Sequence, residues 1–63
     1  MTATITADDK FTCAEREVKM RKKVYPRWVA DGRMSEGKAA LEIQIMEAIA
    51  SDYRAAAEKE RLI

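Results

Sequence analysis

The sequence predicts an all-α protein, a hairpin of two helices whose first helix is kinked near Pro26. Ala, Glu, Lys, Arg and Met dominate the composition, and 63 residues include only two glycines and one proline, a balance that favours helix. Two long stretches also place apolar residues at helical spacing. Between them stand Asp31-Gly32 and Ser35, which are typical of one helix ending and another beginning.

The N-terminal residues 1–11 alternate Thr, Ala and Ile before Asp8 and Asp9, and they lack a helical period. We therefore expect a flexible tail over 1–11 that orders against a partner. The helical hairpin domain is expected to occupy residues 12–63.

The first helix is expected to begin at Thr12, because Thr12-Cys-Ala-Glu15 has the pattern of a capping box. Its apolar arc combines two neighbouring rows. The first row consists of Cys13, Met20, Val24 and Trp28, and the second consists of Ala14, Val18, Tyr25 and Val29. The opposite face carries five cations: Arg16, Lys19, Lys22, Lys23 and Arg27.

Pro26 lies inside this helical pattern, where it removes an amide donor and strains the preceding turn. Because the apolar spacing stays in phase on both sides of Pro26, we expect a kinked helix rather than a break. Tyr25, Pro26 and Trp28 then form one of two structures. The first is a corner plug that holds Trp28 over the start of the second helix, near Ala39 and Ile43, and the second is an aromatic patch that anchors a partner.

The second helix is expected to start after the Ser35 cap and to run to about Arg61 without a breaker. It carries two apolar rows, and one neighbouring helix covers only one of them. The row expected to face the first helix consists of Ala39, Ile43, Met46, Ala50, Tyr53 and Ala57. The other row predicts the interface of a symmetric homodimer with four helices: Leu41, Ile45, Ala48 and Ile49.

Catalytic and cofactor chemistry has little support in the composition. The chain has no histidine, and its single cysteine, Cys13, permits neither an internal disulfide nor a zinc site. Cys13 lies on an apolar row, so we expect it to be buried and inert. We expect no enzyme activity and no cofactor.

The start MTATITADDK lacks the layout of a secretory signal, and no run of about 20 apolar residues is present, so a cytoplasmic protein without membrane contact is expected.

Charge is divided unevenly along the chain, although the net charge is only +1. Basic residues outnumber acidic ones from Lys10 to Arg33, and the reverse holds from Met34 onward. One interpretation of this division is that the two helices carry opposite charge and attract each other. The alternative is a nucleic-acid-binding protein that uses the five cations as phosphate contacts.

The segment Arg21-x-x-Val-Tyr-Pro-x-Trp-Val29, followed by Gly32-Arg-Met and by residues 39–49, resembles small helical proteins encoded by bacteriophages and prophages. The resemblance covers about half of the chain and depends chiefly on V-Y-P-x-W-V. It implies expression inside a bacterial cell and a role as a phage accessory protein. The leading hypothesis is thus a protein–protein interaction module that inhibits or modulates a bacterial or phage protein. A structural role in a virion is a third hypothesis.

Overall fold

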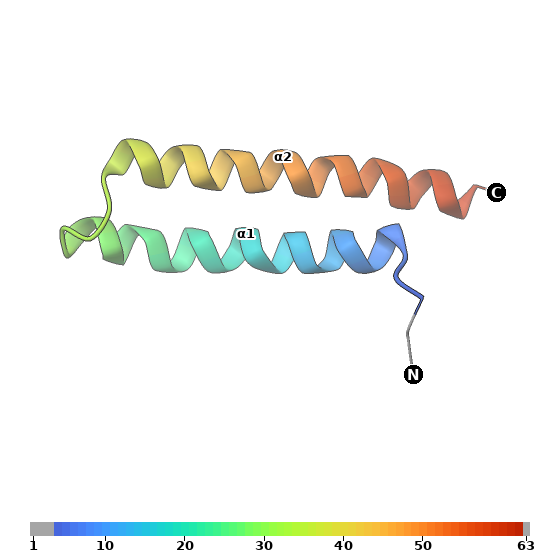
Figure 1. Ribbon diagram of the computed structural model, residues 1–63, viewed down its shortest axis with the longest axis horizontal. Helices are drawn as coiled ribbons and strands as arrows, with labels where there is room; N and C mark the ends of the chain where they lie inside the picture. The colour runs from blue at the N-terminus through green and yellow to red at the C-terminus, as the bar shows by residue number, and fades with distance from the viewer. Residues whose placement is uncertain (1–3, 63) are drawn as a thin grey trace.

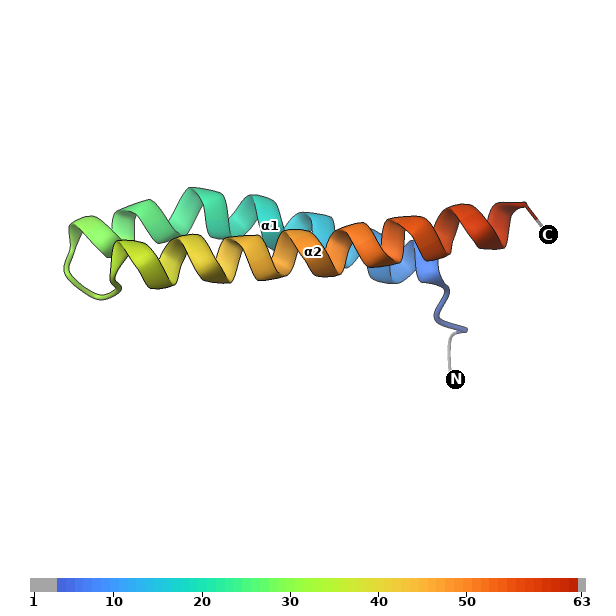
Figure 2. The same cartoon turned by 90° about the horizontal axis from the view of Figure 1, so that it is seen from above.

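A computed structural model describes residues 4–62 and shows two antiparallel helices joined by a tight turn (Figure 1). α1 spans Ala7–Ala30 and α2 spans Glu36–Arg61. They lie side by side, and the start of α1 is at the same end as the end of α2 (Figures 1 and 2). The predicted all-α hairpin is confirmed. Neither helix in the described part of the chain is long and apolar enough to cross a bilayer.

The first helix begins at Ala7, with Thr6 as its N-cap. The Thr6 hydroxyl accepts a hydrogen bond from the Asp9 amide at 3.1 Å, and the Asp9 carboxylate accepts one from the Thr6 amide at 3.0 Å. This reciprocal pair is a capping box. The predicted start at Thr12 is therefore wrong, and residues 7–11 of the expected tail are helical. Residues 1–3 of that tail lie outside the described residues.

Contacts with the far end of α2 explain the earlier start. Arg61 forms a 2.6 Å ion pair with Asp8, and the Ala7 amide donates to the Glu60 carboxylate at 3.2 Å. The Lys10 ammonium lies 5.5 Å from the centre of the Tyr53 ring. The hydrogen-bonded partners are 53 residues apart in the sequence. A local pattern around Thr12 holds no information about such partners.

The helix start leads to a testable difference between two threonines. We expect Thr6→Ala to lower the free energy of unfolding by about 1 kcal/mol, because it removes the cap of the first turn. Thr12→Ala is expected to be nearly neutral, because Thr12 is exposed within the helix and Ala favours helix. Urea denaturation followed by circular dichroism measures both. A larger loss for Thr12→Ala would place the helix start at the position that the sequence predicted.

The end of α1 confirms the predicted stop at Asp31-Gly32. Gly32 has φ 76°, which is the left-handed conformation that glycine adopts without strain. Its amide donates to the Val29 carbonyl at 3.0 Å, and the Arg33 amide donates to the Trp28 carbonyl at 2.9 Å. These two bonds are those of a Schellman motif, so the turn is fixed by local backbone chemistry.

The second helix starts as predicted, because the Ser35 hydroxyl accepts from the Lys38 amide at 3.1 Å. Pro26 lies within α1, which is assigned as one helix on both sides of it. The kink near Pro26 stays a prediction.

The contact between the helices is built largely from small side chains. The buried residues are Ala14, Val18, Ala39, Ala50 and Ala57, and no large side chain within residues 4–62 is fully buried. The molecule measures 47 × 27 × 13 Å, and its smallest dimension is about one helix diameter. Its radius of gyration of 14.6 Å exceeds the roughly 11 Å of a compact domain of this length. The hairpin is a single layer of helices, whereas domains bury their cores between at least two layers.

Candidate interaction surface

Three large apolar side chains of α2 point away from α1. Leu41, Ile45 and Ile49 are 55%, 44% and 38% exposed, respectively, and Ala48 beside them is also exposed. The other apolar row of α2 faces α1, because Ala39, Ala50 and Ala57 are buried and Ile43, Met46 and Tyr53 are half-buried. The predicted division of α2 into two rows is confirmed. The buried members of the row that faces α1 are therefore its alanines, and its larger side chains are half-buried. We refer to Leu41, Ile45, Ala48 and Ile49 as the outer row.

The first helix adds exposed apolar surface of its own. Met20 is 51% exposed and Trp28 is 37% exposed. The Trp28 ring stacks on Tyr25 with the ring centres 5.5 Å apart and the planes 28° apart. These side chains border a shallow groove of about 220 Å³ whose lining comes entirely from α1: Glu17, Met20, Arg21, Val24, Tyr25 and Trp28.

Arg21 connects this groove to α2. Its guanidinium forms a 2.9 Å ion pair with Glu17 and donates to the Glu42 backbone carbonyl at 2.8 Å. The Glu42 carboxylate is 3.7 Å away, and the centre of the Tyr25 ring is 5.9 Å away. The hydrogen bond to Glu17 raises the pKa of Arg21 above its ordinary value. Arg21 therefore stays cationic at any physiological pH, and the cluster is a permanent polar link between the helices.

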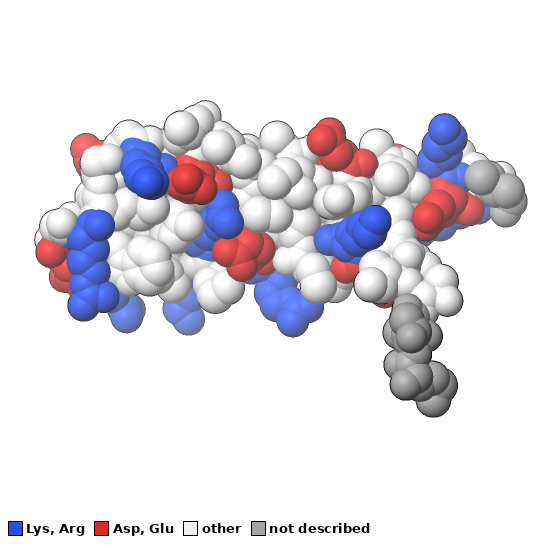
Figure 3. Space-filling model, in the orientation of Figure 1, with Lys and Arg blue, Asp and Glu red and all other residues white. Residues whose placement is uncertain are grey.

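The position of Glu42 places the apolar surfaces of the two helices on one face. Glu42 precedes Ile45 by three residues and Ile49 by seven, so all three lie on the same side of α2. The Arg21 cluster joins that side to the groove of α1. The face shown in Figure 3 has broad uncharged areas on both helices, interrupted by small clusters of acidic and basic side chains.

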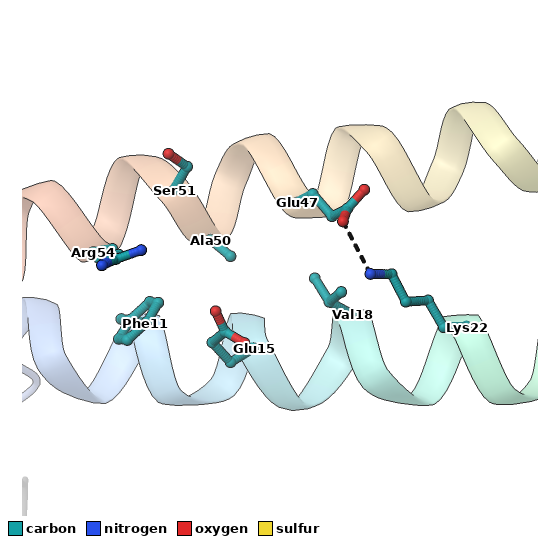
Figure 4. A pocket seen from close by; sticks show the side chains of 8 residues that line it. All are labelled: Phe11, Glu15, Val18, Lys22, Glu47, Ala50, Ser51 and Arg54. Carbon is teal, nitrogen blue, oxygen red and sulfur yellow. Dashed lines mark ion pairs between the residues drawn. The ribbon is translucent and has the colours of Figure 1, made fainter.

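The opposite side of the hairpin has a second shallow groove of about 270 Å³. Figure 4 shows Phe11 and Arg54 at one end of it and the Lys22–Glu47 ion pair, 3.1 Å long, at the other. Both charged side chains of this pair are about half exposed, at 55% and 46%. A pair so exposed to water is typical of ordinary helix surface.

Lys22 is thereby separated from the other cations of α1. The remaining four, Arg16, Lys19, Lys23 and Arg27, are exposed, and their spacing places them on the side of α1 turned away from α2. In Figure 3, Lys and Arg side chains project at several points along the lower edge of α1. None of these four cations takes part in an ion pair within the described residues. We call these four residues the basic edge.

Cys13 is exposed, so the expectation of a buried cysteine is wrong. The contact line of α1 follows Ala14 and Val18, which are buried, and Cys13 falls beside it. Its sulfur accepts a hydrogen bond of 3.6 Å from Arg16.

The corner of the hairpin brings Tyr25 and Pro26 to the start of α2. Together with Val29 they border a groove of about 410 Å³, whose other side is lined by residues including Ala39 and Ile43. Trp28 does not line this groove. It lies on the α1 groove beside Tyr25 and is partly exposed.

Sequence reasoning missed the Arg21 cluster, because Glu17 and Arg21 read as interruptions of an apolar arc. Their separation by four residues was the available signal, since such pairs meet on a helix surface.

No family model matches the chain, and neither the curated proteins nor the solved structures include a significant match.

Proposed function

We propose that the protein is a non-enzymatic interaction module of the bacterial cytoplasm that acts as a homodimer. Its outer row forms the dimer interface, and the dimer binds and modulates or inhibits a bacterial or phage protein. The observation that carries the proposal is the exposure of three large apolar side chains of α2, Leu41, Ile45 and Ile49, on a helix whose buried residues are all alanines.

Burial energetics favour association. Leu41, Ile45 and Ile49 are 55%, 44% and 38% exposed, so covering each of them contributes about half of the 1.5–3 kcal/mol that full burial of such a side chain supplies. A core of four alanines and one valine gives a chain of 63 residues little stability of its own. A second copy supplies the missing layer, and the product is a four-helix arrangement.

The partner surface in this proposal is the corner patch of Tyr25, Pro26 and Trp28. The stacked pair of aromatic rings is partly exposed, and Trp and Tyr are enriched among the residues that contribute most to binding at protein interfaces. The patch also coincides with the V-Y-P-x-W-V segment, whose resemblance to phage-encoded proteins supports the bacterial setting.

Trp28→Ala provides the test of this patch. We expect the unmodified chain to capture a specific protein from bacterial lysate, and we expect Trp28→Ala to lose that protein while circular dichroism remains unchanged. Lys23→Ala is the matched control, because Lys23 is an exposed α1 residue on the basic edge, and it is expected to retain the protein. If both variants capture the same proteins as the unmodified chain, the patch has no role in partner binding.

A second candidate function is nucleic-acid binding through the basic edge. It is supported by four exposed cations that have no ion-pair partner within the described residues. Such binding weakens steeply as salt rises and is lost when Lys19 and Lys23 are both replaced by Ala. Nuclease treatment of the lysate separates the two functions, because capture that depends on nucleic acid disappears and direct protein capture persists.

A further inference from the structure

Opposite charges flank the outer row of α2. Lys38 precedes Leu41 by three residues, and Asp52 follows Ile49 by three. At 100° per residue, the series Lys38, Leu41, Ile45, Ile49 and Asp52 falls within an arc of about 80° on α2. Lys38 and Asp52 are both exposed, and neither has an ion-pair partner within residues 4–62. The row is thus an apolar centre with a cation at one end and an anion at the other.

The spacing of this series is symmetric about Ile45. Lys38 and Asp52 lie the same number of residues before and after Ile45, about 10 Å along the helix axis in each direction. Leu41 and Ile49 likewise flank Ile45 at equal distances. Reversing the direction of the helix therefore exchanges the cation with the anion and leaves the apolar centre in place.

We propose that a second copy of the chain packs its α2 antiparallel against this row, with Ile45 at the two-fold axis. The inference rests on the self-association proposed above and adds its orientation and its specific contacts. Ile45 meets Ile45 of the second copy, and Leu41 meets Ile49 of the second copy. Lys38 pairs with Asp52 of the second copy, and symmetry makes this pair twice.

A parallel arrangement has the opposite electrostatics. It sets Lys38 against Lys38 and Asp52 against Asp52, and like charges repel at both ends of the apolar centre. The same charges that stabilise the antiparallel dimer disfavour the parallel one, so they select the orientation as well as the register.

Charge reversal tests the orientation in the full-length chain. We expect Lys38→Glu and Asp52→Lys each to weaken the dimer about tenfold at low salt, because each turns two attractions into two repulsions. The double variant Lys38→Glu with Asp52→Lys restores the original dissociation constant, and so does an equimolar mixture of the two single variants. Sedimentation equilibrium measures each dissociation constant.

The helix position of Lys38 and a control substitution at Lys23 separate a change in dimer contacts from a change in helix stability or net charge. Lys38 is the third residue of α2 after the Ser35 cap, a position where Glu completes a capping box, so weaker dimerisation of Lys38→Glu does not follow from a weaker helix. Lys23→Glu makes the same change of net charge on the basic edge and is expected to leave the dissociation constant within twofold.

The possible results separate the orientation from self-association itself. A dimer that weakens with each single variant and recovers in the double variant supports the antiparallel pairing. A dimer whose dissociation constant is insensitive to all of these changes overturns the pairing and leaves the proposed self-association standing. An unmodified chain that is monomeric at tens of micromolar overturns both.

Discussion

Ile45→Asp is expected to abolish the dimer and to remove most of the helical structure at micromolar concentration. Ile45 is 44% exposed at the centre of the outer row, and in the proposed dimer it meets its own copy. Because Ile45 is already more than half buried within its own chain, the substitution forfeits about 1 kcal/mol of added burial in each copy. It also brings two carboxylates together in an apolar contact, where each charge lacks a partner. We expect a loss of more than about 4 kcal/mol in dimer stability, most of it from the two unpaired carboxylates and the rest from the lost burial.

Circular dichroism and sedimentation equilibrium together measure this effect. Gln44→Asp is the matched control, because Gln44 is the exposed neighbour of Ile45 but lies off the row by about a quarter turn. The control is expected to keep both the helicity and the mass of the dimer. An Ile45→Asp chain that stays helical and keeps the mass of the unmodified chain would refute the role of the outer row.

Ala50→Leu is expected to lower the melting temperature by roughly 5–20 °C. Ala50 is 4% exposed and belongs to the buried cluster with Ala14 and Val18. A larger side chain there forces the helices apart, and overpacking of this kind costs about 1–3 kcal/mol. In a chain of this size each kcal/mol corresponds to about 4–8 °C.

Ala55→Leu provides the comparison for this prediction, because Ala55 is exposed on the same helix and Leu is nearly as good a helix former as Ala. We expect its melting temperature to change by no more than about 3 °C. Thermal unfolding followed by circular dichroism decides the matter. Equal shifts for the two variants would mean that Ala50 is not in close contact with α1.

The turn and the two rows of α2 could be predicted from the sequence because both depend on local chemistry. Gly32 and Ser35 end and begin helices through their own backbone and side-chain bonds. The rows of α2 follow from helical periodicity alone, and the structure confirms which row is exposed.

The start of α1 could not be predicted in the same way. Thr6 and Thr12 both stand three residues before an acidic residue, so a local pattern cannot choose between them. Contacts from Glu60 and Arg61 stabilise the earlier start, and those contacts exist only once the hairpin has formed. The burial of Cys13 was misjudged for a related reason, because periodicity gives the apolar arc but not the line within it that touches the neighbouring helix.

Part of the candidate surface could not be predicted from local sequence patterns either. The sequence predicted the outer row as apolar surplus, and that exposure is confirmed. The link from Arg21 to the Glu42 carbonyl depends on the alignment of the two helices, which periodicity does not specify. Lys22 joins Glu47 rather than the basic edge for the same reason.

Sedimentation equilibrium of the unmodified chain, from nanomolar to tens of micromolar, tests the claim that a second copy covers the outer row. We expect a mass near twice the 7.2 kDa of one chain at the highest concentrations, falling toward 7.2 kDa on dilution as the helical signal is lost. A fully helical species of 7.2 kDa at tens of micromolar would contradict the account, because it would show that Leu41, Ile45 and Ile49 are stable in water without a partner.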